Sequence, residues 1–291
     1  MALRFLFLLL PAFAACGDQR LPQLELDGSA LGTTFRIAIV EPAADLDTAA
    51  LETGIAAALT RIDELASTWR SDSELSRFNA ANSTDWMAVS ADFCTALADA
   101  LDISRTTGGA FDITVGPLVN LWGFGPDGPV TEPPSDSAIE RSLQTVGFDK
   151  VHTDCQRSVV RKDDAAVYVD LSGWAKGLAV DVVAGVLDAS RVDNYLVEIG
   201  GELRVSGHNS ERRKWAVSIE APSTSQRVPH AVIRVTDTSV ATSGDYRNYF
   251  AHGDRRYSHT IDPRTGRPVT HDLAAVTVIH GVNAYADAMA T

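Results

Sequence analysis

The chain has 291 residues, of which 45% are hydrophobic and 22% are charged, a balance typical of a globular protein that buries a sizeable core. Its formal net charge is −13, and its longest basic run is the triplet at 212–214. A nucleic-acid partner is therefore not expected, because neutralising a phosphate backbone requires a basic stripe.

The N-terminal stretch MALRFLFLLLPAFAAC has the form of an export signal, with Arg4, an apolar run and small residues before Cys16. It is too short to be a stable membrane span. Ala14 and Ala15 directly before Cys16 resemble a bacterial lipobox, in which the cysteine is lipidated. We favour a lipoprotein over a cleaved signal with an incidental cysteine, and Gly17 leaves the choice of membrane open. We predict a lipoprotein signal peptide over 1–15, a tether over 16–27 and a single domain over 28–291.

Strands and helices follow in an irregular alternation. Strands joined by a glycine turn are predicted within 24–40, followed by helices over 45–69, from Ser90 to about Thr106, over 135–146, and from about Ala175 to Leu187. A strand pair is predicted over 159–173, short strands fill 195–280, and a last helix begins at Asn283. Because several strands run consecutively without crossover helices, the fold class is α+β with mixed, largely antiparallel sheets packed with helices.

Two cysteines follow the export signal. Cys94 lies in a helical pattern and Cys155 in a polar turn. An exported protein can pair such residues. We nevertheless predict that both are free and structural.

Two segments carry weak signals for phosphate and metal chemistry. In DLSGWAKGLAVD (170–181) a glycine precedes a helix that starts near Lys176, which suits an anion but equally fits a turn with a solvated lysine. In NAYADAMAT, Asp287 and Thr291 are four residues apart, so a helix places both on one face. Their oxygens suit a hard cation such as Mg²⁺, although such a pair is common in helices.

Two further segments are ambiguous when taken alone. Gly200 and Gly201, flanked by Glu198 and Glu202, form either a tight turn or bare backbone against a flat ligand. His259 in YSHTIDPRTGRP is by itself more typical of a solvated or structural histidine than of a catalyst. The motifs of zinc hydrolases, serine esterases and dinucleotide-binding proteins are absent from the sequence.

The order of these blocks is more specific than any one of them. The lipobox, STWRSDSELSRFN (67–79), GGAFDITVGPLVNLWGFG (108–125), DLSGWAKGLAVD, VEIGGELRVSG (197–207), ATSGDYRNYF (241–250), SHTIDPRTGRP (258–268) and ADAMAT (286–291) occur in succession. The chain thereby resembles the ApbE family of FAD:protein FMN transferases over nearly its whole mature length. The resemblance implies a single T-fold-like catalytic domain over 28–291.

The resemblance also implies a Mg²⁺-dependent enzyme that is lipid-anchored to a bacterial membrane outside the cytoplasm. Such an enzyme takes FAD and links FMN through a phosphoester to a threonine or serine of an acceptor flavoprotein, such as a subunit of a redox-driven ion pump, releasing AMP. Two alternatives stay open: an FAD pyrophosphatase that gives FMN and AMP, and a non-catalytic FAD-binding lipoprotein. Family members continue past the last block, so the resemblance also implies that this chain is truncated at the C-terminus.

Site residues are implied by the same resemblance. His259 matches the proposed base, and the metal ligands match the backbone carbonyl of Ala175 and the side chains of Asp287 and Thr291. Trp69 stands where tyrosine is usual, and Leu31 where methionine is common. The positions that match the flavin site are Leu31, Thr33, Trp69, Ala110, Phe111, Asp112, Ser172, Lys176, Leu178 and Ile261.

Overall fold

The computed structural model describes residues 20–223, 228–246 and 248–291. The predicted signal peptide and Cys16 lie outside these residues. Within them, no helix has both the length and the apolar character needed to cross a membrane.

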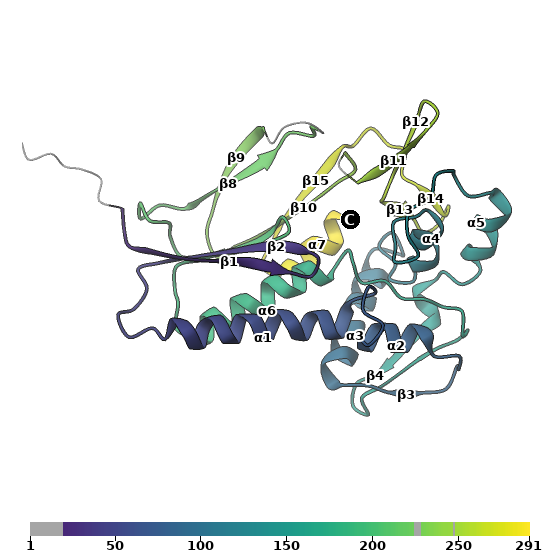
Figure 1. Ribbon diagram of the computed structural model, residues 1–291, viewed down its shortest axis with the longest axis horizontal. Helices are drawn as coiled ribbons and strands as arrows, with labels where there is room; N and C mark the ends of the chain where they lie inside the picture. The colour runs from purple at the N-terminus through teal and green to yellow at the C-terminus, as the bar shows by residue number, and fades with distance from the viewer. Residues whose placement is uncertain (1–19, 224–227, 247) are drawn as a thin grey trace, which may run out of the picture.

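A six-stranded sheet forms the centre of the larger part of the molecule (Figure 1). Its spatial order is β1 (Gln23–Ala30), β2 (Thr33–Val40), β6 (Tyr195–Ile199), β7 (Glu202–Ser206), β10 (Thr238–Gly244) and β15 (Ala275–His280). Each pair of neighbours is antiparallel, which confirms the prediction of largely antiparallel sheets. The predicted strands within 24–40 form the β1–β2 hairpin.

Two long helices cover one face of this sheet, α1 (Thr48–Ala66) and α6 (Ala175–Ala189) (Figure 1). The α1 helix begins after Asp47, whose Oδ1 accepts a hydrogen bond from the Ala50 N–H at 3.0 Å. Apolar residues recur along α1 at helical spacing and pack with apolar residues of β2, β6 and α6. This shared core holds the helices and the sheet together.

The sheet's opposite face carries a hairpin of β8 (Trp215–Glu220) and β9 (Pro229–Val235). Side chains alternate between the two faces along a strand. In β2, Ile37 and Ile39 belong to the core with the helices, whereas Ala38 and Val40 pack with Trp215 of β8. One face of the sheet therefore packs against α1 and α6, and the other packs against the β8–β9 hairpin.

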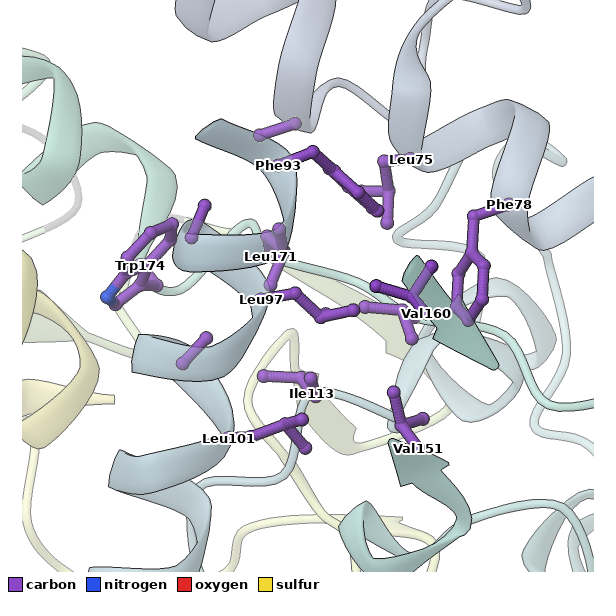
Figure 2. Close-up of a cluster of buried hydrophobic side chains, with 14 of the residues drawn as sticks. Leu75, Phe78, Phe93, Leu97, Leu101, Ile113, Val151, Val160, Leu171 and Trp174 are labelled. Carbon is purple, nitrogen blue, oxygen red and sulfur yellow. The ribbon is translucent and has the colours of Figure 1, made fainter. Parts of the chain in front are cut away.

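A second group of elements packs around α3 (Ala91–Thr106). It contains α2 (Glu74–Ala80), a 3₁₀ turn (Phe148–Lys150) and a small sheet of β3 (Met87–Ala88), β5 (Val159–Lys162) and β4 (Val151–Asp154). Figure 2 shows its apolar core, in which Leu97 and Leu101 lie among Ile113, Val160 and Trp174. The helix begins as predicted, with Ser90 Oγ accepting a hydrogen bond from the Phe93 N–H at 3.1 Å.

The strand pair predicted over 159–173 is wrong in its second half. Only β5 forms there, and it pairs with β4 and β3. The backbone at Val169 bonds instead to a side chain: its N–H and its carbonyl contact Oδ1 and Nδ2 of Asn79, each at 2.8 Å. An asparagine from α2 thus replaces the strand that the alternation of apolar residues predicts.

The prediction that Cys94 and Cys155 are free is also wrong. They form a disulfide, with their Cα atoms 5.5 Å apart, which is a normal separation for such a bond. The β4–β5 hairpin carries its connecting turn back against the start of α3, where Cys94 is fully buried. This contact depends on tertiary structure and leaves no trace in the local sequence pattern.

Short elements complete the chain around an aromatic cluster. They are α4 (Gly116–Leu121), α5 (Asp136–Leu143) and the two-stranded pairs β11 (Tyr249–His252) with β12 (Arg255–Ser258) and β13 (Ile261–Asp262) with β14 (Arg267–Pro268). Trp122 of this region packs near Phe250 and Tyr257, whose rings are stacked with centroids 4.9 Å apart. The strand predicted through YSHTID is interrupted at residues 259–260.

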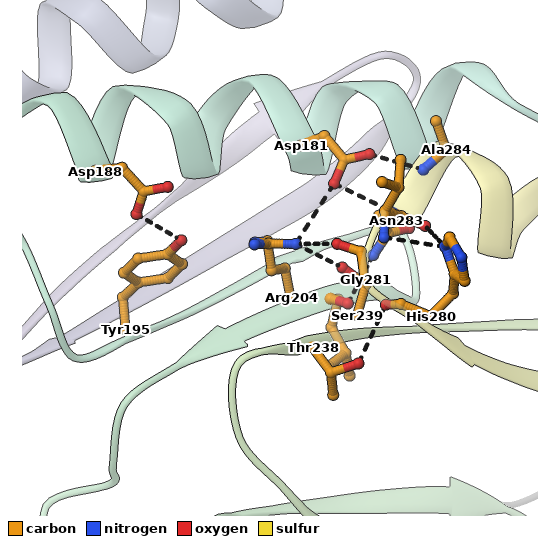
Figure 3. Close-up of polar contacts among 12 residues, drawn as sticks. Asp181, Asp188, Tyr195, Arg204, Thr238, Ser239, His280, Gly281, Asn283 and Ala284 are labelled. Atoms are coloured by element: carbon orange, nitrogen blue, oxygen red, sulfur yellow. Dashed lines mark hydrogen bonds and ion pairs between the residues drawn. The ribbon is translucent and has the colours of Figure 1, made fainter. Parts of the chain in front are cut away.

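The last helix, α7 (Asn283–Ala290), packs against the N-terminal half of α6. Gly177 allows this close approach, because a Cβ atom there would lie 2.6 Å from the Asn283 carbonyl oxygen. Asp181 of α6 caps α7 from outside: its two carboxylate oxygens accept the Asn283 and Ala284 N–H groups at 2.9 and 2.8 Å (Figure 3). The position of α7 is thereby tied to α6.

Candidate active site

A cavity of about 490 Å³ lies where the central sheet, α6, α7 and the short C-terminal strands meet. Most of the residues predicted for the site line it, from segments far apart in the sequence. These predicted residues are Trp69, Ala110, Phe111, Asp112, Ser172, Lys176, His259, Ile261, Asp287 and Thr291.

His259 is half-buried in the wall of this cavity, in the interruption between β12 and β13. Its backbone N–H donates to the Asn248 carbonyl at 3.1 Å, and its Nδ1 lies 3.1 Å from the same oxygen. The latter contact favours the tautomer with the proton on Nδ1, which leaves Nε2 as an acceptor. Burial and the nearby Lys176 charge lower the pKa of His259, although the contact with Asn248 opposes the change.

Lys176, Glu202 and Asp287 form a charged cluster in the same cavity. The Lys176 Nζ lies 3.3 Å from Glu202 Oε1 and 3.6 Å from Asp287 Oδ1. Both carboxylates are almost fully buried, whereas 31% of the lysine side chain is exposed. Burial alone lowers the pKa of Lys176, but the charges of Asp287 and Glu202 outweigh it and raise the pKa above its usual value.

Glu202 is the least satisfied member of this cluster. Its Oε2 is buried without a hydrogen-bond partner among the described residues. Burial and the neighbouring charge of Asp287 raise its pKa to about 8, against the opposing effect of Lys176. A buried carboxyl group with an unpartnered oxygen and a raised pKa is suited to a ligand that brings a cation or a hydrogen-bond donor into the cavity.

Two of the residues implied as metal ligands, Asp287 and Thr291, lie beside the start of α6, the helix that begins at Ala175. Asp287 Oδ2 accepts the Gly177 N–H at 2.9 Å, two residues after Ala175, the first residue of the helix. Thr291 directly follows α7, one turn after Asp287, and its Oγ1 donates to the Asp287 carbonyl at 3.2 Å. No group of three or more His, Cys, Asp or Glu side chains suited to a metal occurs in the described chain. The available donors are hard oxygens, which fit a Mg²⁺ that retains waters and phosphate ligands.

Asp112 has a different local role. One of its oxygens accepts the Thr114 N–H and hydroxyl at 2.8 and 2.6 Å, and the other accepts the Phe148 N–H at 3.0 Å. These bonds hold the loop after α3 against the 3₁₀ turn. Ala110 and Phe111 line the cavity, as does Trp69, which is 69% exposed.

Three predicted flavin contacts do not line this cavity. Leu31 occupies the β1–β2 turn with φ 53°, a left-handed conformation unusual for leucine, and lines a separate cavity beside α1. Thr33 lines a third cavity on the other face of the sheet, and Leu178 packs into the apolar cores around α6. Ala175 is likewise packed against the core around α3 and is not among the residues lining the cavity.

The cavity also contains residues to which sequence reasoning assigned no role. Glu202 is the clearest, because its place beside the Gly200–Gly201 turn was visible but its burial against Lys176 was not. Asn248 holds His259 through its backbone carbonyl, a role that no side-chain pattern reveals. The remaining ones are Val115, Val119, Phe124, Asp170, Gly173, Thr242, Ser243, Gly244, Thr260 and Pro263. Gly200, for which the sequence left a tight turn or a ligand contact open, lines the cavity as well.

The walls of the cavity offer two kinds of chemical surface. Phe111, Phe124 and Trp69 offer apolar and aromatic surface suited to a flat ring system. Lys176 beside the start of α6 offers a positive charge suited to phosphate. A molecule with both a ring system and phosphates fits this division, with His259 available as a base.

Comparison with known proteins shows the family of this chain. The ApbE family matches residues 31–291. An FAD:protein FMN transferase of Vibrio cholerae is 42% identical over 269 residues, covering 92% of this chain and 80% of the relative. The corresponding protein of Haemophilus influenzae is 39% identical over 285 residues, covering 96% and 82%.

Solved structures show the same fold. The flavin transferase ApbE from Vibrio cholerae superposes with a TM-score of 0.85 at 41% identity, covering 93% of this chain and 85% of the other. The apo form of the Pseudomonas stutzeri flavinyl transferase ApbE gives a TM-score of 0.84 at 35% identity, covering 93% and 84%. The chain therefore belongs to the ApbE family and is an FAD:protein FMN transferase.

Proposed function

We propose that this enzyme transfers FMN from FAD to a threonine or serine hydroxyl of an acceptor flavoprotein, with AMP as the leaving group. The hydroxyl oxygen attacks the phosphorus on the FMN side of the pyrophosphate. A phosphoester bond forms, the bond from that phosphorus to the bridging oxygen breaks, and AMP departs with this oxygen. The hydroxyl proton passes to Nε2 of His259. The observation that carries the proposal is that His259 lines one cavity together with Lys176 and Asp287.

The charged groups act on the phosphates. Phosphoryl transfer depends mainly on positioning and on neutralising charge, and Lys176 supplies a positive charge that Glu202 and Asp287 hold in place. Asp287, Thr291 and the carbonyl of Ala175 are the proposed Mg²⁺ ligands. When bound, Mg²⁺ neutralises charge on the phosphates.

We further propose that the protein works outside the cytoplasm, lipid-anchored through Cys16 to a bacterial membrane. The acceptor is then an extracytoplasmic flavoprotein such as a subunit of a redox-driven ion pump. The Cys94–Cys155 disulfide supports this location, because such bonds persist in oxidising compartments. The signal-like N-terminal sequence supports it independently.

The test is incubation with FAD, Mg²⁺ and an acceptor domain, followed by mass spectrometry. The acceptor carries an Asp-x-x-[Ser/Thr]-x-Ala-Thr segment, the type of target that the resemblance to the ApbE family implies. An FMN-sized gain on the acceptor, with AMP in solution, supports the proposal. FMN and AMP in solution without modified acceptor indicate a pyrophosphatase instead. FAD binding without any product indicates a non-catalytic flavin-binding protein.

The metal requirement is tested with Asp287→Asn, which keeps the size of the side chain and removes its charge. We expect Mg²⁺-dependent transfer to be lost, and calorimetric titration with Mg²⁺ in the presence of FAD to show weakened binding. Asp136→Asn is the matched control, because Asp136 is exposed and lies on α5, outside the cavity. Full Mg²⁺ binding by Asp287→Asn would contradict the assignment.

A further inference from the structure

The third cavity, which Thr33 lines, has a volume of about 380 Å³ and lies on the opposite side of the β6–β7 turn from the Lys176 cluster. Thr34 of β2 and Glu198 of β6 line it, and both belong to the sheet face that carries the β8–β9 hairpin rather than α1 and α6. Glu220 at the end of β8 also lines it. The cavity is therefore a groove between the central sheet and this hairpin.

The groove adjoins the active-site cavity. Gly200, Thr242 and Gly244 line both of them. Gly200 has φ 61°, and a Cβ atom there would lie 2.9 Å from Thr33 Cγ2 and 3.3 Å from Lys176 Cδ. A turn of bare backbone is thus the wall between the groove and the charged cluster. A side chain that reaches past this turn from the groove enters the cavity that contains His259.

A sheet edge runs along the same junction. The pairing of β10 with β7 ends at Val240, which lies opposite Leu203 near the start of β7 at Glu202. Because the two strands are antiparallel, β10 continues past the point where β7 begins. The pairing of β10 with β15 continues to Gly244. Among the described strands, residues 241–244 therefore have a neighbour on one side only. Such an edge can pair with an added extended peptide.

The walls of the groove favour a polypeptide over a nucleotide. Among the described residues, no lysine, arginine or histidine lines the groove to neutralise a phosphate, whereas the threonine hydroxyls and the glycine backbone offer hydrogen bonds to a peptide. The active-site cavity offers Lys176 and several apolar or aromatic side chains instead. The ring system and phosphates of FAD match the first cavity, and an extended peptide matches the groove.

We propose that the groove between the sheet and the β8–β9 hairpin binds the acceptor protein as an extended segment beside residues 241–244 of β10. The segment presents its threonine or serine hydroxyl past Gly200 to His259. This inference rests on the proposed function and adds the route by which the acceptor approaches. It also assigns a purpose to the Gly200–Gly201 turn, since a side chain there would narrow the passage.

The test is Thr34→Trp, which places a large side chain in the groove from an exposed position on β2. Thr53→Trp is the matched control, because Thr53 is an exposed threonine of α1 on the other side of the sheet. The acceptor is the domain carrying the Asp-x-x-[Ser/Thr]-x-Ala-Thr segment. We expect kcat/KM for this acceptor to fall about ten-fold or more in Thr34→Trp, with unchanged FAD affinity by flavin fluorescence. We expect the control to match the wild type.

A cross-linking measurement covers the case in which Thr34→Trp disturbs folding. We expect Thr34→Cys, but not Thr53→Cys, to form a mixed disulfide with an acceptor that carries a cysteine two residues from its target threonine. An unchanged acceptor kcat/KM in a folded Thr34→Trp protein overturns the proposal, as does the absence of the cross-link. Loss of FAD affinity in this variant, with its melting temperature retained, would assign the groove to the nucleotide. Wild-type enzyme that leaves the acceptor unmodified refutes the proposed function instead.

Discussion

The Nζ atom of Lys176 lies 3.3 Å from Oε1 of Glu202, so that a buried carboxylate anchors a lysine whose side chain remains 31% exposed to the cavity. Glu202 comes directly after the Gly200–Gly201 turn, whereas Lys176 lies in the first turn of α6. The pair therefore connects the sheet to the helix at the point where phosphate is expected. Asp287 adds α7 to the same cluster, 3.6 Å from the ammonium.

Glu202→Gln should change how stability depends on pH. The pKa of Glu202 is raised from 4.5 to about 8, first by burial, so between these values the folded protein holds a proton that the unfolded chain releases. The contribution of Glu202 to the free energy of unfolding should therefore fall as pH rises through this window, by up to about 1.4 kcal/mol per pH unit. The variant should lose most of this slope in urea denaturation with EDTA present.

The control for this experiment is Glu64→Gln, an exposed glutamate on α1. It should keep the wild-type slope. If Glu202→Gln and the wild type show equal slopes from pH 5 to pH 8, the raised pKa of Glu202 is wrong.

His259→Ala should abolish most FMN transfer while FAD remains bound. Loss of a general base typically lowers rates about 10²- to 10⁴-fold. Burial lowers the pKa of His259 below 6.5, so the neutral form predominates at pH 7, and the wild-type rate should fall only as pH drops below 6.5. Rates of acceptor labelling between pH 5 and pH 8 measure this.

His252→Ala provides the control, because His252 is an exposed histidine of β11 that contacts the Thr131 carbonyl at 3.2 Å. It should transfer FMN at the wild-type rate. Full activity in His259→Ala would contradict the role of His259 as the base. So would a wild-type rate that already decreases while the pH is lowered from 8 to 7.

Much of the fold could be predicted from local patterns. The helix that begins after Ser90 and the β6–β7 hairpin follow from a capping serine, apolar spacing and a glycine pair, all of which act over a few residues. The segment after β5 could not be predicted in this way, because Asn79 satisfies the backbone of Val169 from 90 residues away. Local alternation contains no information about such a partner.

Some residues of the candidate site could likewise be predicted from the sequence, and others could not. His259 and Asp287 stand in recognisable blocks, so the resemblance predicts both for the site, and the structure places both in the lining of one cavity. Glu202 was visible beside a turn, but its burial and its contact with Lys176 arise only when α6 packs under the sheet. The Cys94–Cys155 bond depends likewise on the packing of a hairpin turn against α3.

Removing the Cys94–Cys155 disulfide should lower stability without abolishing activity. The bond closes a loop with a sequence separation of 61 residues, for which the chain-entropy relation gives about 4 kcal/mol. Cys94→Ala/Cys155→Ala should therefore melt about ten degrees lower in calorimetry. Transfer at 25 °C should persist, because neither cysteine lines the cavity. Dithiothreitol should lower the melting temperature of the wild type and leave that of the double variant unchanged. Equal melting temperatures for the wild type and the variant would contradict the bond's contribution.

Asp181→Ala should weaken Mg²⁺ binding although Asp181 is not one of the proposed metal ligands. Its carboxylate accepts the N–H groups of Asn283 and Ala284, and the residue before α7, Val282, makes no side-chain cap of its own (Figure 3). Without this cap the first turn of α7 loses two partly buried hydrogen bonds, at a cost of about 1–3 kcal/mol. Fraying of α7 displaces Asp287, so the Mg²⁺ concentration required for half-maximal transfer should rise.

Asp188→Ala is the matched control on the same helix. Asp188 is exposed and accepts a hydrogen bond from the Tyr195 hydroxyl at 2.9 Å. It lies farther along α6 than Asp181, away from the first turn of α7 (Figure 3). It should leave the Mg²⁺ requirement unchanged and cost less stability than Asp181→Ala. Asp181→Asn retains one acceptor oxygen, so its Mg²⁺ requirement should fall between those of the wild type and Asp181→Ala. Equal Mg²⁺ requirements in Asp181→Ala and Asp188→Ala would show that α7 keeps Asp287 in place without the cap, through its packing against Gly177 alone.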